Sequence, residues 1–166
     1  MTSPRHSPAQ RFFFLPLLLA LSLTLASCMS VFTGLETVAT PASQSAAPQL
    51  TAIRSENGLT PLAPDPTLEK AALAQARNMA VAGRMRHDTG AQRDFLTRMR
   101  SEGMRGVYAE NIAHGRFDTA RVLSVWMDSS DHRANMLDQR FSRYGLAYAT
   151  DPVDSDRRYW AMVLGN

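Results

Sequence analysis

The single cysteine of this chain, Cys28, constrains its fold most. It is the only cysteine among 166 residues, so no disulfide can form within the chain and a folded domain must be held together by its core alone. It also follows a stretch typical of an export signal, in which Arg5 and Arg11 precede the apolar run 12–25. That run is too short to span a bilayer comfortably. We therefore predict a signal peptide over residues 1–27 and an exported domain without disulfides.

The residues around the cysteine indicate how the exported protein is held. Leu25-Ala26-Ser27-Cys28 is similar to a bacterial lipobox, in which signal peptidase II cleaves before a cysteine that carries a diacylglyceryl group. An ordinary signal peptide with a chance cysteine is the alternative, because a short motif has false positives. Each buried acyl methylene contributes about 0.8 kcal/mol to anchoring in the bilayer. Met29 stands where Asp is associated with inner-membrane retention in Gram-negative bacteria. In a host with two membranes we therefore expect the outer one, with the domain facing the periplasm or the cell surface.

Composition divides the exported part in two. Residues 28–49 are rich in Ser, Thr, Ala and Pro, and we expect them to be a flexible tether. Residues 50–166 are enough for one compact domain. The formal net charge is +3. Removing Arg5 and Arg11 leaves 16 of the 18 basic side chains against 15 acidic ones, a net charge near +1 with no basic stripe. Nucleic acid is therefore not an expected partner.

Within that domain, periodicity and capping residues predict helices that flank a small sheet. The clearest helix begins at Asp65-Pro66, with Asp as N-cap, and ends at Gly83. Its apolar face, which should be core, is Leu68, Ala72, Ala76, Met79 and Ala80. The other expected helices are 50–56, 91–102, 118–127 and 131–137, and the expected strands are 107–109, 144–148 and 158–164, the last two forming an antiparallel hairpin. We predict an α+β fold, a three-layer α-β-α sandwich with a mostly antiparallel sheet.

In the 91–102 helix, Phe95 and Met99 are expected to face inward, with Arg93, Arg98 and Arg100 in solvent.

Three separated segments carry polar groups suited to one shared site. They are His87, the run Glu110-Asn111-Ile112-Ala113, and Trp126 followed by His132-Arg133-Ala134-Asn135-Met136-Leu137. With Asn57-Gly58-Leu59, Tyr144-Gly145-Leu146 and Tyr159-Trp160, these motifs are collinear over nearly all of residues 50–165. The chain thus resembles the bacterial branch of the CAP superfamily, named for cysteine-rich secretory proteins, antigen 5 and plant pathogenesis-related proteins. The resemblance implies that family's α-β-α sandwich.

The resemblance also implies a set of site residues. The family's central cleft carries two His and two Glu, which bind zinc or another divalent cation in several members. His87 matches the first His, Glu110 the first Glu and His132 the second His, whereas Ser129 stands at the position of the second Glu. Met162 replaces a Gln that the family often has on its last strand. A triad of His87, Glu110 and His132 is therefore expected to line the cleft with Ser129.

Two imidazoles and a carboxylate are acceptable ligands for Zn²⁺. Ser129 would be a poor fourth ligand, so affinity should be modest and should fall as the histidines are protonated. The alternative is that Glu110 hydrogen-bonds one histidine and organises the cleft without a metal.

Other candidates are weaker. Ser129 and His132 could touch across a helical turn, but no acid partner or nucleophile-elbow pattern accompanies them. His114 is expected at the rim or facing solvent. Asn111 and Asn135 are expected to tie loops to backbone groups around the cleft. The two tryptophans are expected in the core.

Two functions of different classes follow. The first is a binding module without enzymatic activity, an anchored envelope lipoprotein whose cleft or adjoining groove holds a lipid, glycan or peptide. The second is a metal-assisted hydrolase of peptide or cell-wall material, with Glu110 as general base and His87 and His132 holding zinc. A structural spacer in the envelope, with a vestigial cleft, is a third possibility.

Overall fold

The computed structural model of the protein describes residues 37–90 and 94–166. The predicted signal peptide, residues 1–27, and the predicted lipidation site at Cys28 lie outside this part of the chain. The described elements are β1 (Ala39–Pro41), α1 (Ser43–Glu56), β2 (Ala63–Pro64), α2 (Pro66–Ala82), α3 (Phe95–Ser101), β3 (Tyr108–Gly115), α4 (Thr119–Asp128), α5 (Ser130–Met136), β4 (Arg143–Asp151) and β5 (Asp154–Gly165). Within this part of the chain, no helix is both long and apolar enough to cross a bilayer.

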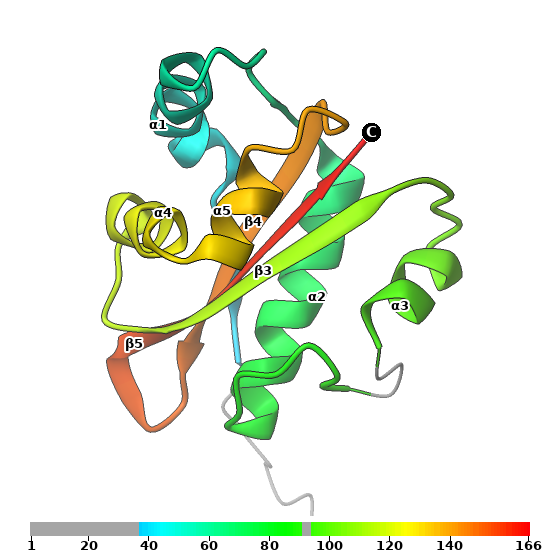
Figure 1. Ribbon diagram of the computed structural model, residues 1–166. Coiled ribbons are helices and arrows are strands. Elements are labelled where there is room, and N and C mark those ends of the chain that lie inside the picture. Colours follow the sequence, from blue (N-terminus) through cyan, green and yellow to red (C-terminus); the bar gives the residue numbers. More distant parts are fainter. Residues whose placement is uncertain (1–36, 91–93) are drawn as a thin grey trace, which may run out of the picture. The chain divides into compact units, whose positions relative to one another are not determined.

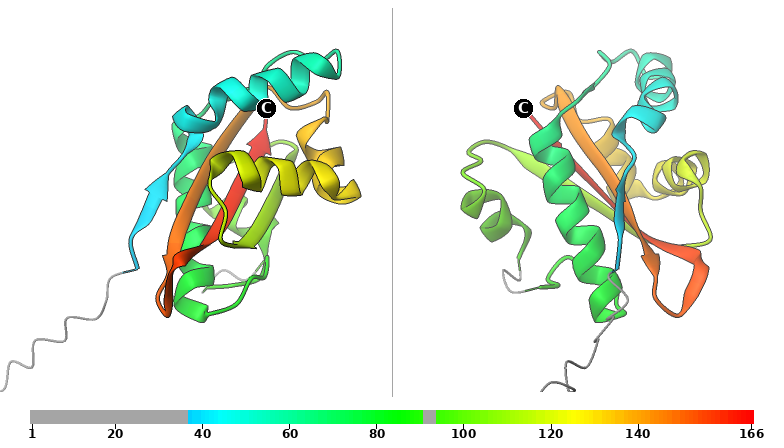
Figure 2. Two further views of the ribbon diagram at one scale, coloured as in Figure 1. Left: turned by 90° about the vertical axis from the view of Figure 1, so that its left-hand side faces the viewer. Right: turned by 180° about the vertical axis from the view of Figure 1, so that it is seen from behind.

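The five strands form one sheet covered by helices on both faces (Figure 1). Its main path runs β1-β4-β5-β3, and β2 pairs with β4 off this path. All pairings are antiparallel except the two-residue parallel pairing of β2 with β4. Helix α2 covers one face, and α1, α4 and α5 cover the other (Figure 2). The predicted α+β, three-layer sandwich with a mostly antiparallel sheet is confirmed.

Alternation along β5 gives the sheet two separate cores. Trp160, Met162 and Leu164 pack with α1, α4 and α5, whereas Ala161 and Val163 pack with α2 and α3. This follows from the period of two in a strand, which sends successive side chains to opposite faces. Trp160 is fully buried, as expected, and so is Trp126 of α4 on the same side of the sheet.

Helix α2 begins and ends where its capping residues predict. The Asp65 carboxylate accepts hydrogen bonds from the backbone N–H groups of Thr67 and Leu68, and Gly83 closes the helix in a left-handed conformation with φ of 59°. The expected inward face is buried along its whole length. Small alanines on that face let α2 approach the sheet closely.

The folded domain begins earlier than composition indicated. The tether was expected to extend to residue 49, but β1 pairs with β4 and α1 begins at Ser43. The Tyr144 hydroxyl donates to the Ser43 carbonyl over 2.6 Å, and Ala46 is fully buried. The prediction was wrong here because a segment of small residues can bury its backbone against a sheet without large apolar side chains. The helix expected at 50–56 is the second half of α1.

The remaining boundaries differ by shorter distances. Helix α3 begins at Phe95 after Asp94, whose side chain caps it, and residues 91–93 of the helix expected over 91–102 lie outside the described part of the chain. The strand expected at 107–109 continues through Glu110 to Gly115 because all eight of its residues pair with β5.

Candidate functional site

The edge strand β3 positions the candidate site. It lies at one end of the sheet path, with β5 as its neighbour. Glu110 is opposite Val163 and Asn111 is opposite Met162, so these two consecutive residues point to opposite faces of the sheet. Glu110 faces the side of α2 and α3, and Asn111 faces α5. The site therefore extends around both sides of one strand edge.

On the side of α2 and α3, the Glu110 carboxylate contacts the side chains of His87 and Arg98. Its Oε1 lies 2.8 Å from His87 Nδ1, and its Oε2 accepts a hydrogen bond of 2.5 Å from Arg98 Nη2. The Glu110 side chain is 1% exposed, whereas that of His87 is 53% exposed. Arg98 also donates to the His87 carbonyl over 2.6 Å. One arginine thus fixes both the carboxylate and the backbone of the histidine that the carboxylate orients.

Helix α2 also holds the loop that carries His87. The Gln75 side chain, which is fully buried, donates over 2.8 Å to the Arg86 carbonyl, the peptide group immediately before His87. His87 is therefore attached at its own carbonyl by Arg98 and at the preceding one by Gln75. Such double attachment limits how far the imidazole can move.

On the second side, Asn111 fixes the backbone of His132. The Asn111 amide donates to the His132 carbonyl over 3.0 Å, and Asn135 donates to the Asn111 side-chain oxygen over 2.8 Å. The His132 ring lies against Trp126, with centroids 6.4 Å apart. The expectation that both asparagines tie backbone and loops around the site, rather than bind a ligand directly, agrees with these contacts.

The two histidines influence each other electrostatically. Burial lowers the pKa of His132 from its ordinary value, and the charge of His87 lowers it further, while Asp131 opposes the shift. Like charges must be near to interact in this way, so the two rings lie within electrostatic range of each other although their supports lie on opposite faces of the sheet, and their membership of one site stays a prediction. His132 Nδ1 is buried and, among the described residues, has no hydrogen-bond partner.

Ser129 lies between α4 and α5. Its backbone N–H donates to the Trp126 carbonyl, and its own carbonyl accepts from the Arg133 N–H. The hydroxyl makes no capping hydrogen bond. Ser129 thus lies at the junction of two helices, and its place in the cleft stays a prediction.

The expected set of three metal ligands does not fit this geometry. Within residues 37–90 and 94–166, no group of three His, Cys, Asp or Glu side chains is arranged to hold a metal ion. The physical reason is the position of Arg98: both Glu110 oxygens are engaged, and one of their partners is a permanent cation. Glu110 instead resembles the carboxylate that orients a histidine from behind. This is the alternative in which Glu110 organises the site through hydrogen bonds.

Comparison with known proteins identifies the family. The model of the CAP family, described as the cysteine-rich secretory protein family, matches residues 49–164. The chain belongs to the CAP family. It is 35% identical over 96 residues to YkwD, an uncharacterized protein of Bacillus subtilis (strain 168), and the match spans 57% of this chain but only 37% of YkwD.

Solved structures share the CAP fold of this chain. An extracellular protein containing an SCP domain from Bacillus anthracis superposes with a TM-score of 0.64 at 22% identity, covering 74% of this chain and 39% of that one. An outer surface protein from Borrelia burgdorferi gives a TM-score of 0.67 at 17% identity, covering 78% and 98%. A cysteine-rich secretory protein from Staphylococcus aureus gives 0.57 at 17%, covering 74% and 37%. These neighbours are extracellular or surface proteins of bacteria.

Two residues of this CAP domain differ from expectation. Arg98 was expected in solvent, yet it is buried beneath Glu110 and lies over the Phe95 ring at 5.7 Å. The helical spacing predicts this burial, because residue 98 is three positions after Phe95 and shares its inward face.

His114 is the second correction. It was expected at the rim or in solvent, but its side chain is 16% exposed, bonds to Asp151 over 2.8 Å and stacks on Tyr159 with centroids 3.9 Å apart. Arg157 contacts its other ring nitrogen. Because both nitrogens are engaged, His114 connects β3 to the β4–β5 hairpin and is not part of the site at His87.

Proposed function

We propose that this CAP domain is a binding module of the bacterial envelope, exported and anchored through an acylated Cys28, that holds a polar envelope ligand at His87 and His132 without turning it over. A glycan or a peptide, or the two joined as in cell-wall material, is the ligand class. The surface and extracellular neighbours support the location, and the geometry around Glu110 supports the absence of turnover.

The observation that carries this proposal is the Arg98–Glu110 pair. A general base needs a carboxylate that can accept a proton from a reacting group. Glu110 is almost fully buried, and its two oxygens are occupied by Arg98 and His87. Neither oxygen is therefore free to take a proton from a ligand. The role of Glu110 is to orient His87.

The groups left to meet a ligand are imidazoles. His87 is half exposed, and with Nδ1 turned to Glu110 its Nε2 is the nitrogen that a ligand can contact. Burial and the charge of His87 lower the pKa of His132, which favours a neutral ring at neutral pH. Neutral imidazoles donate and accept hydrogen bonds with hydroxyl and amide groups. Such groups are abundant in glycans and peptides.

The test is calorimetric titration of the purified protein with soluble peptidoglycan fragments that contain both sugar and peptide. We expect saturable binding that His87→Gln and His132→Gln each weaken at least about tenfold, the loss of roughly 1.4 kcal/mol. Arg121→Gln, which changes an exposed side chain of α4, should bind like the wild type. If neither fragments nor isolated glycan and peptide parts bind, or if the histidine variants bind equally well, the proposal fails and the spacer role takes its place.

A metal-assisted hydrolase is the second candidate, favoured by the His87–Glu110 hydrogen bond, because metal-binding histidines commonly donate their second ring nitrogen to a carboxylate. It predicts fragment cleavage in the presence of zinc, abolished by a chelator. Zinc titration at neutral pH, with His87→Ala as control, tests the cation separately. Intact fragments after incubation with zinc, together with zinc heats equal to those of the control, would exclude this candidate.

Anchoring is tested by mass spectrometry of the protein isolated from its host. We expect the mass of a chain that begins at an acylated Cys28. Cys28→Ser should release the protein from the membrane fraction. A wild-type chain that is cleaved elsewhere and carries no acyl group would contradict the anchor while leaving the binding proposal open to its own test.

A further inference from the structure

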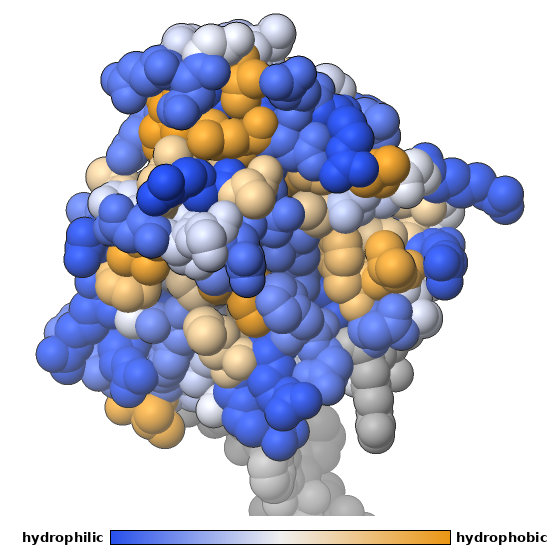
Figure 3. Space-filling view, in the orientation of Figure 1, coloured by the Kyte–Doolittle hydropathy of each residue, from blue (hydrophilic) through white to orange (hydrophobic). Residues whose placement is uncertain are grey.

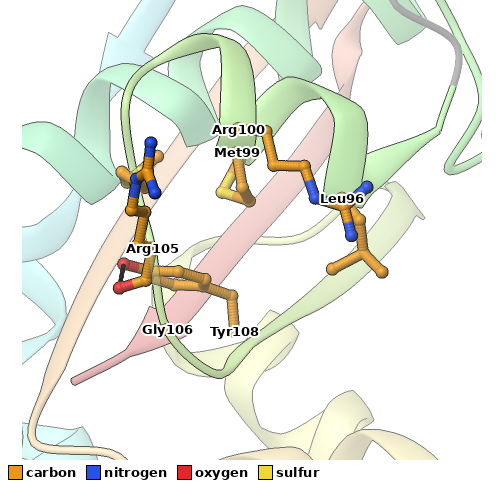
Figure 4. A pocket seen from close by; sticks show the side chains of 7 residues that line it. Leu96, Met99, Arg100, Arg105, Gly106 and Tyr108 are labelled. Carbon is orange, nitrogen blue, oxygen red and sulfur yellow. Dashed lines mark hydrogen bonds between the residues drawn. The ribbon is translucent and has the colours of Figure 1, made fainter.

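A pocket on the surface lies between α3 and the segment that leads into β3. It has a volume of about 540 Å³ and is lined by Leu96, Met99, Arg100, Met104, Arg105 and Tyr108 (Figure 4). We call it the α3 pocket. None of its lining residues takes part in the hydrogen bonds that hold His87, Glu110 or His132. A role for the α3 pocket is therefore independent of the function proposed for those residues.

The apolar part of the α3 pocket reaches the surface. Met99 is buried and Met104 is half buried, whereas Leu96 is 49% exposed and Val107, just before β3, is 41% exposed. Figure 3 shows hydrophobic residues at α3, on the right of the view, bordered by hydrophilic ones. A chain laid across such an open pocket keeps its backbone amides in water, so that only one apolar side chain has to be buried.

Two arginines flank these apolar side chains. In Figure 4, Arg105 lies on one side of Met99 and the Arg100 guanidinium lies on the other. Among the described residues neither arginine forms a salt bridge, and no carboxylate lines the pocket. Glu102, the carboxylate at the end of α3, pairs with Lys70 of α2 over 2.7 Å. The α3 pocket therefore has a positive charge on each side and no acidic side chain of its own to balance them.

The position of the two charges restricts the kind of partner. Because Met99 lies between the two guanidinium groups, a partner that pairs with both must carry an apolar group with an acidic group on each side of it. A molecule with a single acidic end leaves one arginine without a partner. A peptide segment supplies the required order directly, as one apolar residue between two Asp or Glu residues. Methionine, arginine and tyrosine, which line the pocket, are also enriched in protein–protein interfaces.

We propose that the α3 pocket docks an acidic segment of a partner protein, in which one apolar side chain packs on Met99 and Met104 and the flanking carboxylates pair with Arg100 and Arg105. Guanidinium groups pair well with carboxylates because their planar donors match both oxygens. Methionine side chains are flexible and polarizable, and they adapt to apolar side chains of varied shape. The charges of the segment therefore determine specificity, and the apolar residue contributes burial.

The test is fluorescence anisotropy of labelled synthetic peptides with the purified protein. Each Glu peptide carries one Leu between two Glu residues, placed one, two or three positions away on both sides. The matched peptides carry Lys in place of both Glu residues, or Gln in place of Leu. We expect saturable binding of at least one Glu peptide, at least about tenfold tighter than that of either matched peptide. Added salt should weaken this binding, because it screens exposed charges.

Charge reversal of the protein is the sharpest variant. Arg100→Glu with Arg105→Glu should weaken binding of the Glu peptide at least about tenfold and give binding of the Lys peptide instead. Both side chains are exposed, so the fold should tolerate the exchange. Arg100→Gln with Arg105→Gln removes the charges without reversing them and should weaken binding of the Glu peptide alone. Arg121→Gln, an exposed arginine of α4, is the matched control and should bind like the wild type.

Methyl NMR signals locate the bound peptide. Those of Met99 and Met104 should shift on saturation with the Glu peptide, and Leu96→Gln should weaken its binding. Equal binding of the Glu and Lys peptides, an unchanged preference in the reversed variant, or no saturable binding of any Glu peptide would each overturn the proposal. Dodecanoate, which carries a single charge, is the last probe, and the proposal also fails if dodecanoate binds more tightly than every Glu peptide.

Discussion

Arg98 donates a 2.5 Å hydrogen bond to Glu110, and both side chains are almost completely buried. This pair determines what the site at His87 can do. It turns the carboxylate toward His87 and removes it from the groups that a ligand or a metal could reach. Since Arg98 belongs to α3 and Glu110 to β3, the pair also attaches a seven-residue helix to the edge of the sheet.

Removing Arg98 should destabilise the fold strongly. Arg98→Met leaves Glu110 as a buried charge without its main partner, and we expect a loss of about 3–5 kcal/mol in the free energy of unfolding. Urea denaturation measures it. The double variant Arg98→Met/Glu110→Leu should lose less, because no charge is left buried. Arg100→Met, two positions along the same helix and exposed, is the control. A loss under about 1 kcal/mol for Arg98→Met would show that water compensates the carboxylate.

How much could be predicted from sequence depends on whether a feature is local. The limits of α2 follow from Asp65 and Gly83, which act on neighbouring backbone groups, and the β4–β5 hairpin follows from composition and a turn. The extent of β3 could not be predicted, because its last residues are stabilised by pairing with β5 rather than by their own propensity. The same holds for β1, whose partner β4 is about 100 residues away.

The site shows the same division. The His87–Glu110 contact was expected from the resemblance to the CAP family, and the two asparagine contacts from the usual role of buried amides. The charge of Arg98 predicted a solvated side chain, whereas its position on the inward face of the helix determines its burial. The hydrogen bond between His114 and Asp151 joins residues of different strands, and no short-range pattern in the sequence predicts it.

His132 should make stability depend on pH. Its pKa is lowered in the folded state, first by burial and then by His87, so the unfolded chain binds the proton more tightly. Stability is then fully present above the ordinary pKa of 6.5 and is lost as the pH falls from there through the lowered value. NMR titration of the ring should give a pKa below 6.5.

A single variant separates the two causes of the lowered pKa of His132, which are burial and the charge of His87. His87→Gln removes the neighbouring charge, so the pKa of His132 should rise but remain below its ordinary value because burial persists. A His132 ring in the wild type that titrates at or above the ordinary value would contradict the buried position of the ring.

Arg54 of α1 is the largest buried polar side chain that sequence reasoning missed. It is 1% exposed and donates to the carbonyls of Thr60, Met136, Asp138 and Phe141. Burial lowers its pKa. Arg54→Met should cost about 3 kcal/mol or more, because the Met136 carbonyl at the end of α5 and three carbonyls of two loops lose their donor. Thermal and urea unfolding measure the loss, and Arg77→Met on the exposed side of α2 is the control. An unchanged midpoint would mean that the two loops are held by other contacts.

Gly145 of β4 sets how closely α2 can approach the sheet. A Cβ at this position would overlap the backbone nitrogen of Glu69 and the carbonyl carbon of Leu68. Both are main-chain atoms of a helix, which cannot turn aside as a side chain can. Gly145→Ala should therefore cost about 3 kcal/mol or more, at or above the usual upper range for overpacking. Gly58→Ala is the matched comparison, since a Cβ there meets no atom within 4 Å and only the φ of 70° opposes it, a cost of about 1 kcal/mol. Equal losses for the two variants in urea denaturation would mean that α2 shifts away from β4 freely, and that the alanine-lined face of α2 does not require close contact.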